Sequence, residues 1–150
     1  MHNKKYKETY RELSHGTDVE SATIIRNNGF KISERSDSWC GPGIYFYDIK
    51  KKAWWAARRK CSEIKKETGK KVEPTVLFAD IIDIETDKIF DLRAYKDLCD
   101  FEEKITPLLG EYSFELSGMN ETEKIIQLRS LFISYYAEKN DKKLIIGNFR

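Results

Sequence analysis

The sequence predicts an α+β fold, in which strands and helices mix without strict alternation. Stretches with helical spacing of apolar residues and short stretches of β-branched and aromatic residues follow each other irregularly along the 150 residues. A chain of this length is large enough for one core, and 40% hydrophobic with 35% charged residues is ordinary for a globular protein. We therefore expect a single domain over residues 1–150.

Capping and stop residues delimit the elements of the first half. Asp18 and Asp48 are placed to cap helices, and Gly29 and Gly69 are placed to end them. The expected elements are a strand over 8–14, a helix over 18–28, a loop over 33–42, a strand around Tyr45 and a helix over 50–68. The expected inward residues are Val19, Ala22, Ile25 and Arg26 in the first helix, and Ala53, Trp54, Ala57, Cys61 and Ile64 in the second.

The second half predicts two strands and two further helices. Asn120 and Glu123 have the spacing of a capping box. The expected elements are a strand over 75–84, a helix over 91–105, a helix from Asn120 through Glu138 and a strand over 143–149. The expected inward residues are Leu92, Tyr95, Leu98, Phe101 and Ile105, then Ile125, Leu128, Phe132 and Tyr135. An apolar terminal strand needs neighbours on its edges, which leaves open a domain that is incomplete beyond Arg150.

Charge is distributed unevenly along the chain. Residues 50–71 contain ten basic and two acidic side chains, whereas residues 72–150 contain ten basic and sixteen acidic ones. A basic block of this kind can attract an anionic ligand, whether a dinucleotide, a nucleic acid or an acidic protein. A solvated lysine-rich helix face is the alternative.

Cysteine usage and hydropathy bear on the compartment. Cys40, Cys61 and Cys99 fit neither a disulfide framework nor a CxxC metal pattern, so we expect reduced thiols and no metal site. No apolar run approaches the roughly 20 residues that cross a bilayer, and the amino terminus does not encode a secretory signal. We expect a cytoplasmic protein without a membrane partner.

Two segments carry the chemistry. The first is Ser14-His15-Gly16-Thr17, and the second is the glycine-bracketed Gly41-Pro42-Gly43-Ile44-Tyr45-Phe46-Tyr47. Strand alternation sends Ile44 and Phe46 to one face and Tyr45 and Tyr47 to the other. An imidazole, a backbone without a neighbouring Cβ and an aromatic ring facing one cleft would sandwich a planar amide-bearing ring such as nicotinamide.

The order of these segments resembles the ADP-ribosyltransferases of the diphtheria-toxin and poly(ADP-ribose)-polymerase type. The likeness covers residues 8–60: His-Gly-Thr, then Ile24 to Phe30, then Gly-x-Gly-Ile-Tyr-Phe, then a helix starting near Ala53. It implies a split mixed β-sheet core with flanking helices. It also implies a mono-ADP-ribosyltransferase that uses NAD as substrate, with a protein or nucleic-acid acceptor. A toxin or defence effector with an inhibitory partner is the analogous context.

The resemblance implies a role for each motif residue. His15 would hold a ribose hydroxyl of NAD, Gly16 would bond the nicotinamide carboxamide through its backbone, and Tyr45 would stack on the nicotinamide ring. Thr17 would support the histidine. Active members add a glutamate that stabilises the oxocarbenium ion, and Glu111 is the candidate here.

Other interpretations stay open. His15 can be a strand-end histidine satisfied by backbone bonds, Tyr45 a packed aromatic, and Thr17 a helix start; Trp54 fits the core and Trp55 the surface. The chain can be an inactive or fragmentary domain that binds NAD or another nucleotide as an interaction module. An RNA 2′-phosphotransferase would need a second histidine, and His2 is the one available. A plain nucleic-acid binder would use the basic block together with exposed aromatic side chains.

Overall fold

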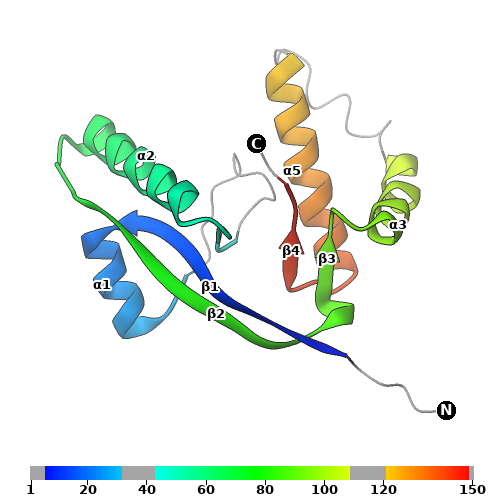
Figure 1. Ribbon diagram of the computed structural model, residues 1–150. Helices are drawn as coiled ribbons and strands as arrows, with labels where there is room; N and C mark the ends of the chain where they lie inside the picture. Colours follow the sequence, from blue (N-terminus) through cyan, green and yellow to red (C-terminus); the bar gives the residue numbers. More distant parts are fainter. Residues whose placement is uncertain (1–5, 32–42, 109–120, 149–150) are drawn as a thin grey trace. The chain divides into compact units, whose positions relative to one another are not determined.

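The structure is a computed structural model that describes residues 6–31, 43–108 and 121–148, with the side chains of 121–127 left aside. The described residues form an α+β structure of four α-helices and two two-stranded sheets (Figure 1). The elements are β1 (Lys7–Asp18), α1 (Val19–Asn28), α2 (Lys50–Thr68), β2 (Pro74–Glu85), β3 (Ile89–Asp91), α3 (Tyr95–Ile105), α5 (Glu121–Lys139) and β4 (Leu144–Ile146), with 3₁₀ turns at Thr86–Lys88 and Thr106–Leu108.

The chain divides into two compact units. Residues 8–32 and 44–83 make the first, which we call the amino-terminal unit. The second, the carboxy-terminal unit, comprises residues 1–7, 33–43 and 84–150. The predicted α+β class is confirmed, and the expected single domain stays a prediction.

A long ribbon of two strands is the frame of the amino-terminal unit. β1 and β2 pair in one sheet and run in opposite directions (Figure 1). Near one end the Val19 N–H donates to the Glu73 carbonyl at 2.9 Å. Further along, the Glu12 N–H donates to the Asp80 carboxylate at 2.8 Å, and Glu12 has a φ of +55°. A side chain replaces a ladder carbonyl there, so the ribbon is locally irregular.

The helix boundaries of this unit follow local capping chemistry. Asp18 accepts a hydrogen bond from the Ser21 N–H at 3.0 Å and caps α1, as predicted. α1 and α2 end at Gly29 and Gly69, also as predicted. Gly69 has a φ of +73°, in the left-handed region that favours glycine. The predicted cap at Asp48 is wrong, because α2 begins after Ile49 without a side-chain cap.

The buried face of α2 is narrower than the sequence predicted. Ala53 and Ala57 are completely buried, whereas Trp54, Cys61 and Ile64 are half-buried. In α1 the prediction holds for Ala22 and fails for Val19 and Arg26, which are exposed. That helix has ten residues and covers the sheet with little more than one small side chain.

Parallel pairing of β3 with β4 organises the carboxy-terminal unit. Ile89 is opposite Leu144 and Asp91 is opposite Ile146. The predicted strand over 143–149 is therefore present as β4, whereas its partner β3 was not predicted: residues 89 and 90 were in no predicted element, and Asp91 was expected to start a helix. The predicted helix over 91–105 starts later, at Tyr95.

Two side chains of α3 that were expected to face inward are exposed. The Asp97 carboxylate accepts the Asp91 N–H at 2.8 Å, which ties the first turn of the helix back to the end of β3. Tyr95 is 83% exposed and Leu98 is also exposed, so these two predictions are wrong. Phe101 and Ile105 do face the core, as predicted.

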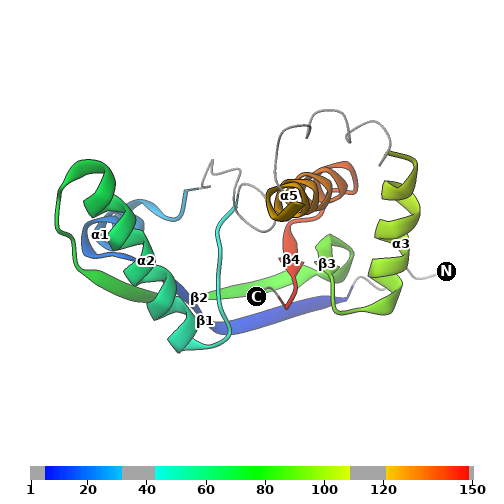
Figure 2. The same cartoon turned by 90° about the horizontal axis from the view of Figure 1, so that it is seen from above.

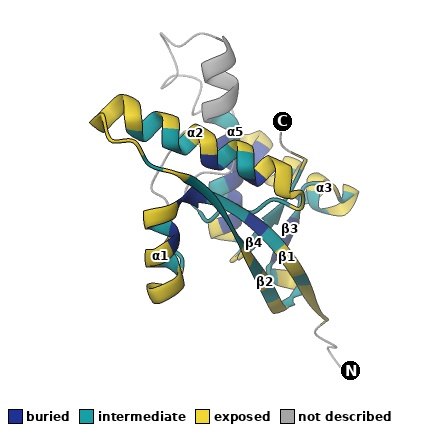
Figure 3. Ribbon diagram, turned by 60° about the vertical axis from the view of Figure 1, so that its left-hand side comes forward, coloured by how far each residue is buried: buried dark blue, intermediate teal, exposed yellow. Residues whose placement is uncertain are grey.

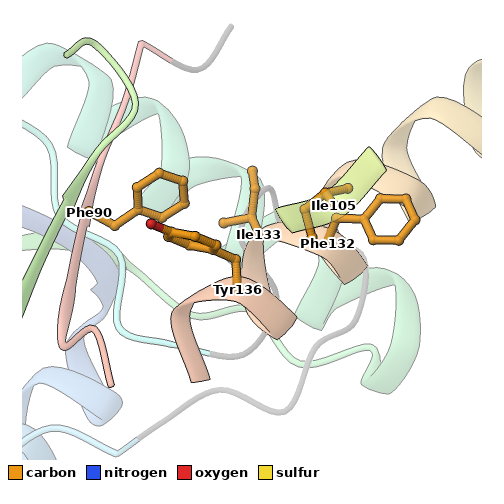
Figure 4. Packing of buried hydrophobic residues seen from close by; sticks show 5 residues of the cluster. All are labelled: Phe90, Ile105, Phe132, Ile133 and Tyr136. Carbon is orange, nitrogen blue, oxygen red and sulfur yellow. The ribbon is translucent and has the colours of Figure 1, made fainter. Parts of the chain in front are cut away.

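The core of the carboxy-terminal unit gathers on α5 (Figure 4). Both views place α3 and α5 beside the β3–β4 pair (Figures 1 and 2). Phe90 stacks at an angle on Tyr136 with ring centroids 4.5 Å apart. The Tyr136 hydroxyl donates to the Asp100 carboxylate, and burial together with this bond raises the pKa of the tyrosine. The buried members are Phe90, Ile105, Phe132, Ile133 and Tyr136, with Leu128 and Tyr135 packed against them; Asn120 and the side chain of Ile125 lie outside the described residues.

The close approach of β1 to α2 generates a first prediction. A Cβ on Gly16 would lie 1.9 Å from the Ala53 carbonyl oxygen and 2.8 Å from the Ala57 nitrogen. Both are helix backbone atoms that cannot rotate away, so we expect Gly16→Ala to destabilise the protein by about 3 kcal/mol or more. Gly43→Ala is the matched control, because its Cβ would meet nothing within 4 Å. Urea unfolding of both variants makes the comparison, and equal stabilities would contradict this packing.

Candidate functional site

A backbone pairing brings the two motif segments together in the amino-terminal unit. The Ser14 N–H donates to the Tyr47 carbonyl at 2.8 Å, and the Tyr47 N–H donates to the Ser14 carbonyl at 2.7 Å. This antiparallel bridge lies outside the named strands. The predicted strand around Tyr45 is therefore wrong in form, because one local pairing replaces it. The predicted adjacency of the two segments is present.

His15 is held in one tautomer by this arrangement. Its Nδ1 lies 2.7 Å from the Tyr45 carbonyl oxygen. A carbonyl oxygen only accepts hydrogen bonds, so Nδ1 carries the proton and the neutral ring keeps its lone pair on Nε2. The tyrosine thus contributes a backbone oxygen that orients the imidazole.

The surroundings of His15 favour its neutral form. Burial lowers the pKa of the imidazole below its usual 6.5, the bond to the Tyr45 carbonyl opposes this shift, and the nearby Lys60 charge adds to it. The net direction is downward, so the ring is an uncharged hydrogen-bond acceptor at neutral pH. A cationic role for this histidine is disfavoured.

Two phenylalanine rings flank the imidazole. The ring centroid of Phe30 lies 5.2 Å from that of His15 in an edge-on arrangement, and the centroid of Phe46 lies 5.8 Å away. The two phenylalanines also contact each other at 5.2 Å. Neither phenylalanine was predicted to contact His15, although the aromatic residue in each motif segment was an available signal.

Gly16 has a packing reason to be glycine. The missing Cβ makes room for the backbone of α2 at Ala53 and Ala57, both fully buried. This close packing explains why residue 16 is a glycine, and the explanation does not need a bound ligand. The expected bond between its backbone and a nicotinamide carboxamide stays a prediction.

A lysine that the sequence analysis did not single out ties the start of α1 to α2. The Lys60 ammonium donates to the Thr17 hydroxyl at 2.8 Å and to the Ser21 hydroxyl at 3.3 Å. It also forms an ion pair with Asp18 at 3.1 Å. Lys60 lies three residues after Ala57 and four before Ile64, so its position on the inward stripe was the available signal. Thr17 is completely buried, and its hydroxyl is bound within the protein.

Asp18 remains ionised within this cluster. Burial would raise the pKa of the carboxyl, but hydrogen bonds from the hydroxyl and backbone N–H of Ser21 and the contact with Lys60 outweigh it and lower the pKa to about 2. The side chain is 4% exposed. This carboxylate is committed to capping α1 and pairing with Lys60, which leaves it poorly placed to serve a substrate.

The remaining site expectations concern parts beyond this cluster. Glu111, the candidate third catalytic residue, lies outside the described residues, and so does the loop expected over 33–42. Within the described ranges, no group of three or more His, Cys, Asp or Glu side chains is arranged to hold a metal ion. None of the described helices is long and apolar enough to cross a membrane.

Comparison of this chain with protein-family models, with curated proteins and with solved structures finds no match. The resemblance to ADP-ribosyltransferases therefore rests on the motif residues alone and stays a prediction.

The ionised Asp18 generates a second prediction. Its pKa is about 2 in the folded protein against 3.8 unfolded, so the unfolded chain binds more protons between these values. The stability that Asp18 contributes, about 2 kcal/mol, is present above pH 4 and disappears as the pH falls through 2. Asp18→Asn keeps a capping side chain and should remove this part of the pH dependence, which urea unfolding between pH 7 and 2 measures.

Glu20→Gln is the control for this prediction. Glu20 pairs with Lys70 on the surface, with both side chains more than half exposed. Such a pair contributes about 0.5 kcal/mol or less. An equal loss of stability in Asp18→Asn and Glu20→Gln would contradict the larger contribution to stability that is predicted for Asp18.

Proposed function

We propose that this protein is a mono-ADP-ribosyltransferase that cleaves NAD and transfers ADP-ribose to a macromolecular acceptor. The observation that carries the proposal is the bond between His15 Nδ1 and the Tyr45 carbonyl. It joins the two motif segments and leaves a neutral nitrogen, Nε2, as a hydrogen-bond acceptor. A fixed acceptor of this kind suits a ribose hydroxyl, which donates one hydrogen bond.

The chemistry of transfer sets what the site must do. The bond between C1′ of the ribose and the nicotinamide nitrogen breaks, and its electron pair leaves with nicotinamide as a neutral ring. The acceptor nucleophile then forms a bond to C1′ and loses its proton. Positive charge develops on the ribose between these events, so a nearby carboxylate lowers the barrier.

Each motif residue has a part in this proposal. His15 orients the ribose, the backbone of Gly16 receives the carboxamide, and the ring of Tyr45 stacks on nicotinamide. Thr17 supports His15 through its backbone, since its buried hydroxyl already binds Lys60. Glu111 supplies the carboxylate. A cytoplasmic location fits the reduced-thiol expectation for this chain.

A second candidate function is NAD or nucleotide binding without turnover. Two observations favour it. Asp18, a carboxylate close to the His15 step, is engaged by Lys60 and Ser21. The aromatic rings placed against His15 are those of Phe30 and Phe46, whereas Tyr45 meets His15 through its backbone carbonyl.

Substitution of His15 separates a structural histidine from a functional one. The amide nitrogen of His15→Asn can replace Nδ1 as donor to the Tyr45 carbonyl, while the variant lacks an acceptor at the position of Nε2. We expect this variant to stay folded and to bind NAD at least tenfold more weakly by calorimetry. Tyr45→Ala should also weaken NAD binding, while Tyr45→Phe should retain it, because stacking needs the ring and not the hydroxyl.

Weak NAD binding would be informative only if folding is intact, so circular dichroism accompanies each variant. Wild-type protein that does not bind NAD would contradict the transferase, and wild-type protein that binds no other nucleotide either would contradict both candidate functions. Full NAD affinity in His15→Asn would assign His15 a structural role.

Glu111→Gln distinguishes turnover from binding. The substitution removes the carboxylate and keeps the size of the side chain. It should slow the release of free nicotinamide by about a hundredfold or more, because no carboxylate then stabilises the positive charge that develops on the ribose. NAD affinity should change little. Glu115→Gln, a neighbouring carboxylate in the same stretch, is the matched control. Unchanged release in Glu111→Gln would remove this residue from the mechanism.

A further inference from the structure

The solvent face of α2 is basic along its whole length. Packing against β1 uses Ala53 and Ala57, and exposed positions recur along the helix between the buried and half-buried ones (Figure 3). Helical spacing puts the exposed positions on the stripe opposite the two alanines. The stripe, which we call the α2 outer face, consists of Lys51, Lys52, Trp55, Arg58, Arg59, Ser62 and Lys66.

Acidic side chains do little to neutralise this face. The helix contains eight basic and two acidic residues, and no acidic residue lies in its first turn. Glu63 forms an ion pair with Arg59 at 3.3 Å, and Glu67 lies near the other end. The amino-terminal end of the helix adds the positive pole of its dipole. The surface therefore presents a strip of positive charge to solvent.

An aromatic side chain stands in the middle of this charge. Trp55 is 58% exposed, and the Arg59 guanidinium lies over its ring, 5.5 Å from the centroid. The cation covers one side of the indole and helps to hold the ring in place. The opposite ring face is then suited to another planar group. In the same unit Phe78 of β2 is 56% exposed and is paired with Lys50 at 5.8 Å.

The combination of charge and stacking surface selects among polyanions. A phosphate backbone follows a row of lysines and arginines, and an unpaired base stacks on an exposed aromatic ring. A duplex hides its base faces and would leave the indole unused. A membrane surface needs a broad apolar helix face, whereas α2 already uses its apolar side against β1.

We propose that the α2 outer face binds single-stranded nucleic acid, with lysines and arginines contacting phosphates and Trp55 stacking on a base. The binding is sequence-tolerant, because each base has a ring face that can stack. This surface does not depend on the proposed transferase activity, since His15 and the NAD it would hold are not part of it.

Fluorescence anisotropy of the full chain with a labelled oligothymidine of about 15 nucleotides tests the proposal. We expect binding that weakens steeply between about 50 and 200 mM salt and is tighter than binding to a duplex of the same length. Trp55→Ala should weaken it roughly five- to one-hundred-fold, and Trp55→Phe should recover most of that deficit. Lys51→Gln with Lys66→Gln should reduce the slope of log affinity against log salt by about 0.7 for each phosphate that the protein no longer neutralises.

Two controls decide what the result means. Tyr95→Ala removes a surface aromatic of α3 that is 83% exposed, and it should leave oligonucleotide binding unchanged. NAD binding measured on Trp55→Ala should equal that of the wild type, so a failure of this proposal is distinguishable from a failure of the transferase.

Several outcomes would overturn the proposal. Equal affinity for single strand and duplex, or unchanged binding in Trp55→Ala, would show that the α2 outer face attracts polyanions by charge alone, without stacking on Trp55. Polyglutamate that competes as well as the oligonucleotide would assign the face to an acidic protein. Tighter, Trp55-dependent binding to phosphatidylserine vesicles would assign it to a membrane surface.

Discussion

The contact between the backbone of β1 and the backbone of α2 is the constraint on which the amino-terminal unit depends. Gly16 leaves no side chain between the strand and the helix at Ala53. That closeness brings Lys60, about two helical turns further along, to the end of β1, where it binds Thr17 and Asp18. Asp18 in turn begins α1. The absence of a Cβ at Gly16 therefore sets the distance between β1 and α2 at which Lys60 can pair with Asp18.

The same contact gives α2 two chemically different sides. Its small residues face the sheet because the strand approaches so closely, and larger side chains would not fit there. The charged and aromatic residues are consequently left on the outside. The basic block of the sequence forms, in three dimensions, an exposed stripe of α2 that includes Trp55.

Much of the fold was predictable because its signals are local. Caps and stops at Asp18, Gly29 and Gly69 need no knowledge of distant residues, and they set helix ends correctly. One local signal failed, because α2 begins after Ile49 and is not capped by Asp48. The failures at β3, at α3 and in the site are non-local. β3 is three residues long and is recognisable only through its pairing with β4, and α3 starts after this strand, at Tyr95. In the site, the meeting of His15 with residue 45 was predictable from motif order, whereas contact through a carbonyl oxygen and two phenylalanine rings was not.

The parallel pairing of β3 and β4 has a consequence for the order in which the chain folds during synthesis. Ile89 and Leu144 are about 55 residues apart, so this pair and the core around it must wait for nearly the whole described chain to leave the ribosome. The strands and helices of the amino-terminal unit lie almost entirely within residues 8–83 and become available much earlier. The nascent protein therefore passes through a stage in which the cluster around His15 can form while Phe90 is still without its aromatic neighbours from α5.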